Sequence, residues 1–570
     1  MENFDQYLEP HKYYQHALKD IHNENVEKCF EELTKKSGVN VEENKATMDK
    51  LRKEQEKLNK FSKAVTRANV LLAFAIIFTI LFEIGGIILL IAGINNKNGA
   101  FIGIGVPLLV LGLAIIIVWF AVFKKKRKEA KDVKNKQEAV VNQIIGEAKG
   151  QMAPLNAIFT PDIPIKIANE TSSLIKFDDY QNNTTVNRLS EQFEDKLDTN
   201  IAHSTLVLRS GTVNTNPFML RQVLKMRMLP EVYTGTLVIT YTRRVSDGNG
   251  GTKTVTVTQT LVAHVTEPKP NYSVFTSLNY YTDAASKLSF ARTPAGLEGK
   301  SDKEIDKIAY KKEKEEAKKA EKALKKGGNY TQFSNSKFEA YLNATGRDNE
   351  LEYRLLFTPL AQKNLEYTFS SKEPYGDDVY IDKNKMVTTV STSHDSNMDY
   401  SGGSTNYVHY DYEQIKKNFI NYNNNFYRGI YFDLVPLLSI PLYFQHQSAP
   451  YLSKADESTI SYYEAEALIN TFEPQQFKPK NCDTSVILKP NVIGKNYIEV
   501  TAYGYKAIPR TTFVPTLGGD GIMHPVPVHY YEYQPVEGNT IVNLNSKLET
   551  HGNPSDNGIN YKMFIANLAK

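Results

Sequence analysis

Two long apolar stretches near the N-terminus constrain this chain more than any other feature. Residues 70–94 are almost continuously apolar, and residues 100–123 are so again. Each stretch exceeds the ~20 residues that a helix needs to cross the ~30 Å hydrocarbon core of a bilayer. The linker at 95–99, NNKNG, is just long enough for a tight turn. The pattern predicts a transmembrane helical hairpin over residues 68–123.

Basic residues on both sides of the hairpin predict its orientation. Lys and Arg recur between residues 50 and 67 and again between 124 and 136, whereas the turn carries only Lys97. Cytoplasmic flanks are enriched in Lys and Arg, so we expect a multi-pass protein of the cell membrane with both termini in the cytoplasm and the turn outside. The residues that mark the membrane flanks are Arg67, Lys124, Lys125, Lys126, Arg127 and Lys128, with Trp119 as the interfacial aromatic residue.

An acidic residue lies inside the first apolar stretch. Glu83 is too deep to reach the interface, and the second stretch offers no Lys, Arg or His to pair with it. A charged side chain at this depth costs roughly 2.5–3.5 kcal/mol, so we expect a neutral carboxyl or a partner on another chain. Small residues that allow close helix approach stand nearby, namely Gly85, Gly86, Gly103, Gly105 and Gly112. Helix packing and proton or ion handling both stay open, and the lack of a relay favours packing.

The segments that flank the hairpin are expected to form cytoplasmic helical arms, at residues 1–67 and 124–152. Leu51 and Leu58 recur at seven-residue spacing in the first arm, and Val141 and Ile144 mark a stripe in the second. Such stripes are typical of amphipathic helices. The simplest arrangement is an antiparallel stalk.

The rest of the chain predicts an α+β body. We expect a β-rich domain over 153–295, a charged linking helix over 296–328 and an α+β domain over 329–570. The clearest strand pair is 236–244 with 253–265, joined by SDGNGG, whose Asp-Gly and Asn-Gly pairs suit a hairpin turn. Alternating threonines in the second strand favour a solvated sheet face.

Composition and motifs exclude several classes of function. A net charge of +4 over 570 residues is too small for a dedicated nucleic-acid binder, so no specific nucleic-acid partner is predicted. The two cysteines have no zinc-ligand spacing. Asp395 and Asp399 begin like a calcium loop, but Tyr400 occupies the position that requires glycine. Asp377, Asp378 and Asp382 could lie close together in space, but acidic loops are common and these residues are only weak evidence for a catalytic site. No catalytic, metal or cofactor site is predicted, and an enzyme is not supported.

Three segments of the body carry a resemblance. They are EPKP at 267–270 with LSFAR at 288–292, GRDNE at 346–350 with RLLFTPLAQ at 354–362, and residues 430–447. Together with the hairpin, they resemble an uncharacterised family of two-helix bacterial membrane proteins from mollicutes and related low-GC bacteria. The resemblance implies the membrane topology and adds no catalytic residue.

The sequence thus leads to a functional hypothesis. We expect a membrane-anchored, cytoplasmic-facing scaffold or assembly protein that contacts membrane lipid and binds a protein partner or a second copy of itself. Two alternatives stay open. One is a membrane-bound enzyme with an unrecognised site in the C-terminal region, and the other is a transport-associated subunit that uses Glu83.

Overall fold

The computed structural model is an α+β protein whose chain divides into two compact units. It describes residues 8–95, 99–118, 124–178, 189–196, 198–246, 250–372, 374–445, 460–493, 497–550 and 560–568. The helical unit comprises Val26–Pro161 and Gly403–Tyr422, and the sheet unit comprises Met1–Asn25, Asp162–Gly402 and Asn423–Lys570. Neither unit is one uninterrupted stretch of sequence.

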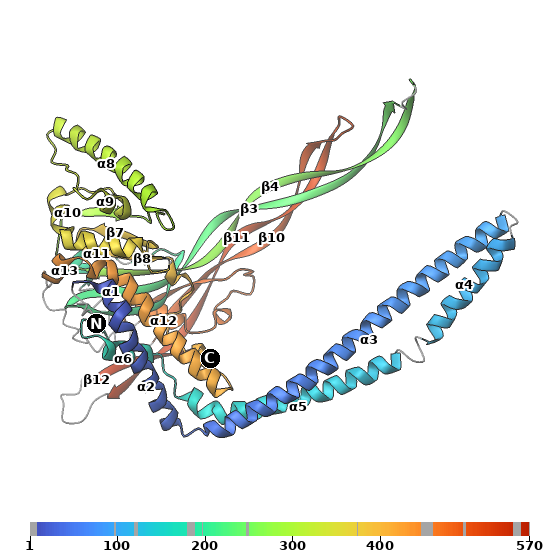
Figure 1. Ribbon diagram of the computed structural model, residues 1–570, viewed down its shortest axis with the longest axis horizontal. Helices are drawn as coiled ribbons and strands as arrows, with labels where there is room; N and C mark the ends of the chain where they lie inside the picture. The colour runs from blue at the N-terminus through green and yellow to red at the C-terminus, as the bar shows by residue number, and fades with distance from the viewer. Residues whose placement is uncertain are drawn as a thin grey trace. The chain divides into compact units, whose positions relative to one another are not determined.

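Three long helices dominate the helical unit: α3 (Val41–Asn95), α4 (Gly99–Val118) and α5 (Lys124–Ala157) (Figure 1). α3 is a single helix of 55 residues. It runs unbroken because the sequence has no glycine or proline between Val41 and Gly85. At 1.5 Å per residue, α3 is about 80 Å long. It therefore joins the first predicted arm to the first predicted apolar stretch without a break.

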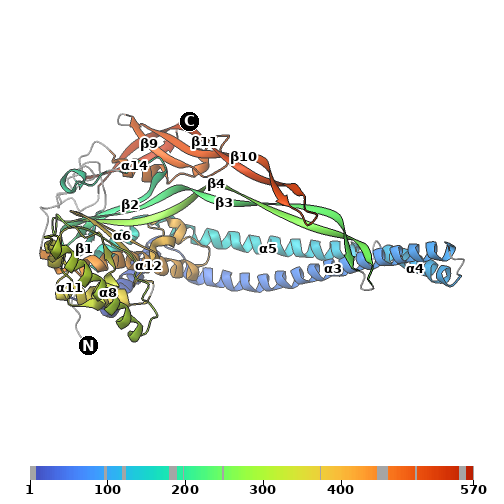
Figure 2. The ribbon, with the colours of Figure 1, turned by 90° about the horizontal axis from the view of Figure 1, so that it is seen from above.

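The two arms lie side by side (Figure 2). Leu51 of α3 is buried against Val141 and Ile144 of α5. The direction of the pair follows from two hydrogen bonds, since Gln137 donates to Glu54 at 2.7 Å, whereas the later Gln151 donates to the earlier Thr47 at 3.0 Å. α5 and the α3 part of the first arm are thus antiparallel, as the predicted stalk requires, whereas Met1–Asn25 of that arm belongs to the sheet unit.

Only part of the predicted membrane hairpin can be tested. Among the described residues, α3 alone is long and apolar enough to cross a membrane, and α4 is comparably apolar only over Ala100–Ala114. Trp119 and the turn residues 96–98 lie outside the described part of the chain. The second span therefore stays a prediction.

Eight described strands of the sheet unit form one antiparallel sheet. They are β1 (Ile175–Phe177), β2 (His203–Val213), β3 (Asn216–Ser246), β4 (Thr252–Tyr281), β5 (Ser289–Arg292), β6 (Ala344–Thr345), β7 (Val379–Asn384) and β8 (Val387–Thr392), in the order β1-β2-β3-β4-β8-β7-β5-β6. β4 pairs with β8 through Leu278 and Val390, among others. The sheet therefore takes strands from both sides of the domain boundary predicted at residue 295.

The predicted β-hairpin is confirmed and is longer than expected. β3 and β4 pair from Phe218 with Tyr280 to Ser246 with Thr252. At about 3.3 Å per residue, each strand extends for about 100 Å. The threonines of β4 between 252 and 260 are exposed, as expected for a solvated sheet face.

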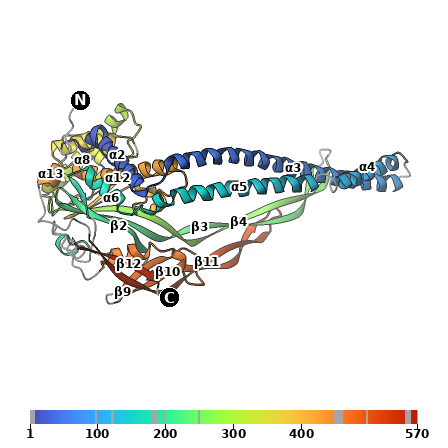
Figure 3. The same ribbon diagram turned by 90° about the horizontal axis from the view of Figure 1, so that it is seen from below.

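A second sheet contains four described strands in the order β12-β11-β10-β9 (Figure 3). They are β9 (Ile487–Ile493), β10 (Tyr497–Leu517), β11 (Met523–Thr550) and β12 (Asn560–Leu568). The β10–β11 hairpin of this second sheet packs on the β3–β4 hairpin through Ile239, Leu261 and Val526. Gly235 permits this approach because a Cβ there would lie 2.0 Å from the Pro527 carbonyl oxygen.

The remaining described helices are shorter than α3 and α5. They are α1 (Pro10–Tyr13), the π-helical turn Tyr14–Leu18, α2 (Lys19–Ser37), α6 (Ile163–Thr171), α8 (Asp302–Lys325), α9 (Ser336–Leu342), α10 (Glu350–Leu356), α11 (Pro359–Ser370), α12 (Tyr412–Leu438), α13 (Pro441–Gln445) and α14 (Tyr462–Ile469), with short 3₁₀ turns η3 (His394–Asn397), η4 (Ser404–Asn406) and η5 (Pro474–Gln476). α8 begins with a capping box between Ser301 and Glu304 and matches the predicted charged helix. Leu434 and Val435 of α12 are fully buried, so this apolar segment is core.

Candidate functional site

The structure brings Glu83 of α3 against Gly112 of α4. A Cβ on Gly112 would lie 2.5 Å from Glu83 Oε1, so a larger residue there would require the Glu83 side chain to move. That oxygen is buried and has no hydrogen-bond partner among the described residues. An unpartnered buried oxygen is costly, which makes this contact the most polar point of an otherwise apolar helix pair.

The predicted packing glycines divide into two groups. Gly86 and Gly105 lie where α3 and α4 touch, because a Cβ on either would come within 3.2 Å of the other's carbonyl oxygen. Gly85 and Gly103 have nothing within 4 Å of a Cβ. Gly93, which the sequence analysis did not single out, also lies at the contact, beside Ile102. The flank residues are exposed, Arg67 on α3 and Lys124, Lys125, Lys126, Arg127 and Lys128 at the start of α5.

Adjacent glycines of α3 allow a direct test of the helix contact. Gly86→Val should loosen the α3–α4 pair by about 1–3 kcal/mol, because its Cβ would lie 2.8 Å from Leu109 Cγ. Gly85→Val carries the same helix-propensity cost and meets nothing within 4 Å. Hydrogen exchange of α3 and α4 amides in detergent micelles should speed up in the first variant only. Equal exchange in the two variants would contradict the contact.

A second site lies in the sheet unit, where α12 crosses the end of β8. His394 begins η3 directly after β8, and Asp378 precedes β7. α12 contributes Asp433, and Asp395 follows His394. The side chains of His394, Asp378, Asp395 and Asp433 are all 2% exposed or less. Four ionisable groups thus share one buried space.

Asp378 fixes the Nδ1 edge of the His394 ring. The imidazole Nδ1 lies 2.7 Å from Asp378 Oδ2 and donates to it, since a carboxylate only accepts. The backbone amide of His394 donates to the same oxygen at 3.1 Å, and Ser393 Oγ donates at 3.2 Å. These contacts set the ring orientation and leave Nε2 pointing to the other acids.

The Nε2 side of the ring faces oxygen atoms. Asp433 Oδ1 lies 3.5 Å away and Asp395 Oδ1 lies 3.8 Å away. Thr392 Oγ1 donates to Asp433 Oδ1 at 2.9 Å, and Tyr400 donates to Asp395 Oδ1. The Gly429 carbonyl oxygen lies 3.4 Å from Nε2. The ring nitrogen is therefore surrounded by potential acceptors or ligands.

Burial and charge shift the pKa values within the cluster in opposite directions. Burial lowers the pKa of His394, but the hydrogen bond to Asp378 and the nearby carboxylate of Asp433 outweigh burial and raise it to about 11. Burial raises the pKa of Asp378, and the hydrogen bond from His394 reverses this, so the net shift is downward. Burial and the neighbouring Asp433 together raise the pKa of Asp395 well above its ordinary value. The close acids therefore favour the protonated forms of His394 and Asp395.

Aromatic groups and a glycine close the site. The Tyr375 ring lies 4.6 Å from the His394 ring, centroid to centroid, and the Arg428 guanidinium lies 4.6 Å from the Tyr375 ring. Gly429 lets α12 approach, because a Cβ there would lie 2.1 Å from the Tyr400 hydroxyl and 3.1 Å from Asp395 Oδ1. The cluster is sealed from solvent on the sides formed by these residues.

The sequence analysis did not predict this cluster. The sequence pattern relates Asp395 only to an incomplete calcium loop, whereas the structure brings it close to His394 and to Asp433 on a distant helix. Of the acids considered together, Asp378 belongs to the cluster, whereas Asp377 pairs with buried Arg292 and Asp382 is exposed. No spacing rule links residues 378, 394 and 433, so a motif search has no signal to find.

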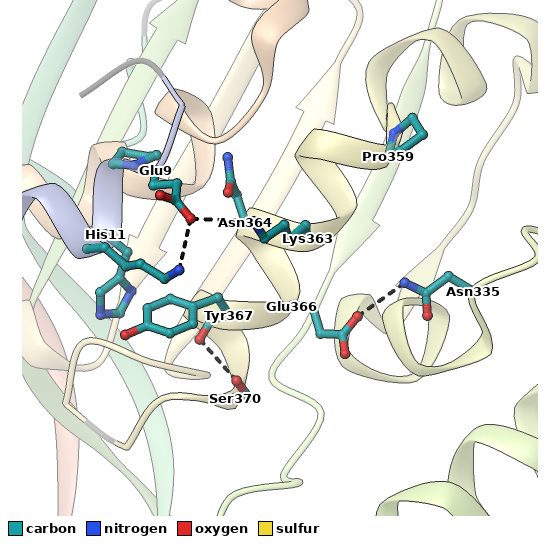
Figure 4. A pocket seen from close by; sticks show the side chains of 11 residues that line it. Glu9, His11, Asn335, Pro359, Lys363, Asn364, Glu366, Tyr367 and Ser370 are labelled. Carbon is teal, nitrogen blue, oxygen red and sulfur yellow. Dashed lines mark hydrogen bonds and ion pairs between the residues drawn. The ribbon is translucent and has the colours of Figure 1, made fainter. Parts of the chain in front are cut away.

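An open cleft of about 430 Å³ lies between α1 and α11 (Figure 4). Its charged groups are largely engaged with one another: Glu9 Oε1 accepts from Lys12 at 2.8 Å and lies 3.5 Å from Lys363. Glu366 accepts from Asn335 at 3.1 Å. The cleft therefore has fewer charged groups available to bind a ligand than the buried cluster has.

The chain was compared with models of protein families, with curated proteins and with solved structures, and nothing matched.

Proposed function

We propose that this protein is a membrane-anchored scaffold or assembly protein, held in a lipid bilayer by the α3–α4 hairpin, with both flanks of the hairpin in the cytoplasm. The observation that carries the proposal is the exposure of large apolar side chains on α3 and α4. They include Phe74, Ile77, Leu81, Ile84, Ile88, Ile94, Val110, Leu113 and Ile117, each about half exposed or more. We further propose membership of the family of bacterial membrane proteins that the chain resembles.

The exposed apolar surface requires an apolar environment. Soluble proteins rarely expose contiguous apolar patches larger than a few hundred Å², and larger patches mark membrane or protein contacts. In contrast, the neighbouring arms expose mainly charged residues, such as Arg67 and Lys124. An apolar segment bounded by basic residues on both sides is typical of a membrane hairpin with cytoplasmic flanks.

Topology can be tested with the native cysteines, Cys29 and Cys482, and one added thiol. In intact cells, a membrane-impermeant maleimide should label an Asn95→Cys variant near the predicted turn and leave the wild type unlabelled. Cys29 should be labelled only after permeabilisation. Labelling of Cys29 in intact cells, or failure of the Asn95→Cys variant to label from the outside, would contradict the orientation.

Membrane anchorage predicts a large effect of charge on α3. Ile84→Arg with Ile88→Arg places two charges on exposed apolar positions and should cost about 5–7 kcal/mol of insertion free energy. We expect this variant to move from the carbonate-resistant membrane fraction to the extractable fraction. Val133→Arg with Val140→Arg on α5 is the matched control, since both residues are also exposed. If both variants stay in the membrane fraction, the proposed anchor is wrong.

The assembly role is supported by Glu83. Glu83 as a whole is partly exposed, and a polar side chain within an apolar segment suits a hydrogen bond from a second chain or a partner helix. Crosslinking in native membranes should give defined oligomers or partner adducts, and Glu83→Leu should reduce them more than Glu83→Gln. A strictly monomeric, partnerless protein would contradict assembly. Loss of proton or ion flux in Glu83→Gln, with assembly intact, would instead favour the transport alternative.

A further inference from the structure

We infer that the buried cluster of His394, Asp395 and Asp433 is a binding site for a divalent transition-metal ion of the Zn²⁺ type, with Asp378 as the residue that positions His394. The ion would join η3 to α12 inside the sheet unit. This inference is independent of the membrane anchor and of the proposed assembly role.

The separations within the cluster suit a common ion. The ligand atoms of the three residues all lie within 4.8 Å of one another. The distances of 3.5 and 3.8 Å from Nε2 to Asp433 and Asp395 exceed those of good hydrogen bonds. Bonds of about 2.0–2.2 Å to a tetrahedral ion separate the ligand atoms by about 3.3–3.6 Å. The 3.5 Å separation of Nε2 and Asp433 Oδ1 already matches this spacing, whereas a pair 4.8 Å apart would have to close by about 1 Å to bind one ion.

A second observation, independent of the clustering, also indicates a ligand. Asp433 is 1% exposed, yet its Oδ2 has no hydrogen-bond partner among the described residues. Buried carboxylate oxygens are nearly always satisfied, because desolvation without a partner is costly. A bound cation would satisfy this oxygen, and it would replace protons at His394 Nε2 and Asp395, because metal ligands bind in their deprotonated forms.

The surroundings resemble the outer shell of a metal site. Metal-binding histidines generally donate their second ring N–H to a carboxylate, which fixes the tautomer and orients the ring. Asp378 accepts from Nδ1 of His394 at 2.7 Å in this way. Thr392 fixes Asp433 at 2.9 Å. The Gly429 carbonyl oxygen, 3.4 Å from Nε2, could supply a further ligand.

The donor set favours one class of ion. One imidazole nitrogen with two carboxylates suits Zn²⁺ and similar transition metals, whereas Ca²⁺ takes six to eight oxygen ligands and Mg²⁺ usually retains several waters. The cluster is closed by Tyr375 and Tyr400. A closed site of this kind is structural, so binding should stabilise the folded sheet unit.

The test uses the full-length protein in detergent, stripped with a chelator and re-equilibrated with Zn²⁺, Co²⁺ or Mg²⁺. We expect one Zn²⁺ per chain by equilibrium dialysis, a rise in the unfolding midpoint with Zn²⁺ but not with Mg²⁺, and a visible Co²⁺ spectrum of a nitrogen–oxygen site. Asp433→Asn and Asp395→Asn should abolish stoichiometric binding. Asp378→Asn should weaken Zn²⁺ binding about 10–100-fold, the effect typical of lost second-sphere support.

Asp198→Asn is the matched control. Asp198 accepts from His203 at 2.9 Å and from Arg221 at 2.7 Å, and among the described residues this histidine–aspartate pair belongs to no group of three potential metal ligands. This variant should bind Zn²⁺ like the wild type. Absence of stoichiometric Zn²⁺ binding by the wild type would overturn the inference whatever the variants do. Equal binding by folded Asp433→Asn, or equal stabilisation by Mg²⁺, would overturn it as well.

Discussion

Replacing Asp377 with alanine is expected to destabilise the sheet unit by about 3–5 kcal/mol, because the change leaves a buried guanidinium without its counter-ion. Arg292 and Asp377 form an ion pair whose side chains are 0% and 1% exposed. Burial lowers the pKa of Arg292 to about 10, and Asp377 opposes that shift. Asp377 Oδ2 also accepts from the backbone amides of Ala295 and Gly296 at 2.8 Å each. Alanine would remove all of these contacts at once.

The measurement is urea unfolding of the full-length protein in detergent, followed by circular dichroism. Asp306→Ala is the control, since Asp306 pairs with Lys337 at 2.7 Å but both side chains are about half exposed. Exposed pairs contribute about 0–1 kcal/mol. If Asp377→Ala costs no more than Asp306→Ala, the buried pair does not stabilise the fold as described.

Acidification from pH 7 to pH 5 is expected to weaken the docking of the N-terminal helices by about 2 kcal/mol for each of two histidines. Burial lowers the pKa of His11 to about 4 and that of His22 to about 4. Between pH 6.5 and pH 4 the unfolded chain therefore binds more protons than the folded chain, so stability is highest above pH 6.5 and falls as the pH drops through this window. His22 stacks on Tyr427 at 4.3 Å, and its Nε2 lies 3.1 Å from the Asn423 carbonyl oxygen.

Unfolding free energies of the wild type, His11→Gln and His22→Gln at pH 7 and pH 5 check this expectation. Carboxylates titrate in the same range, so the informative quantity is the difference between each variant and the wild type at the two pH values. Each glutamine variant should lose about 2 kcal/mol less on acidification than the wild type. Parallel losses in all three proteins would show that the buried histidines do not set the acid sensitivity.

Local patterns in the sequence predicted local structure well. The stalk follows from stripes that include Leu51 and Ile144, and the β3–β4 hairpin follows from a turn at 246–251 between alternating strands. In each case the residues that specify the element also make its contacts. The α8 capping box is of the same kind, because Ser301 and Glu304 are three residues apart.

Such local patterns did not predict the contacts between residues that are far apart in the sequence. The strand order depends on pairs such as Leu278 with Val390, which no periodicity relates. The same holds for the candidate metal site, where Asp433 reaches His394 from a helix that begins 18 residues later, at Tyr412. Arg292 and Asp377 each look like ordinary surface charges in the sequence, and only the fold buries them together. Sequence analysis could therefore predict the elements but neither their assembly nor the site.

The packing of the first helices has a consequence for the order of synthesis. Tyr431 of α12 donates a hydrogen bond to the Pro10 carbonyl oxygen across 421 residues of sequence, and His22 contacts Asn423. At about 5–20 residues per second, the ribosome needs about 20–80 s to make the chain between these partners. During that time the apolar face of Tyr14 and Leu18 has no native surface to cover it. The N-terminal helices therefore cannot complete their native contacts until α12 has been synthesised.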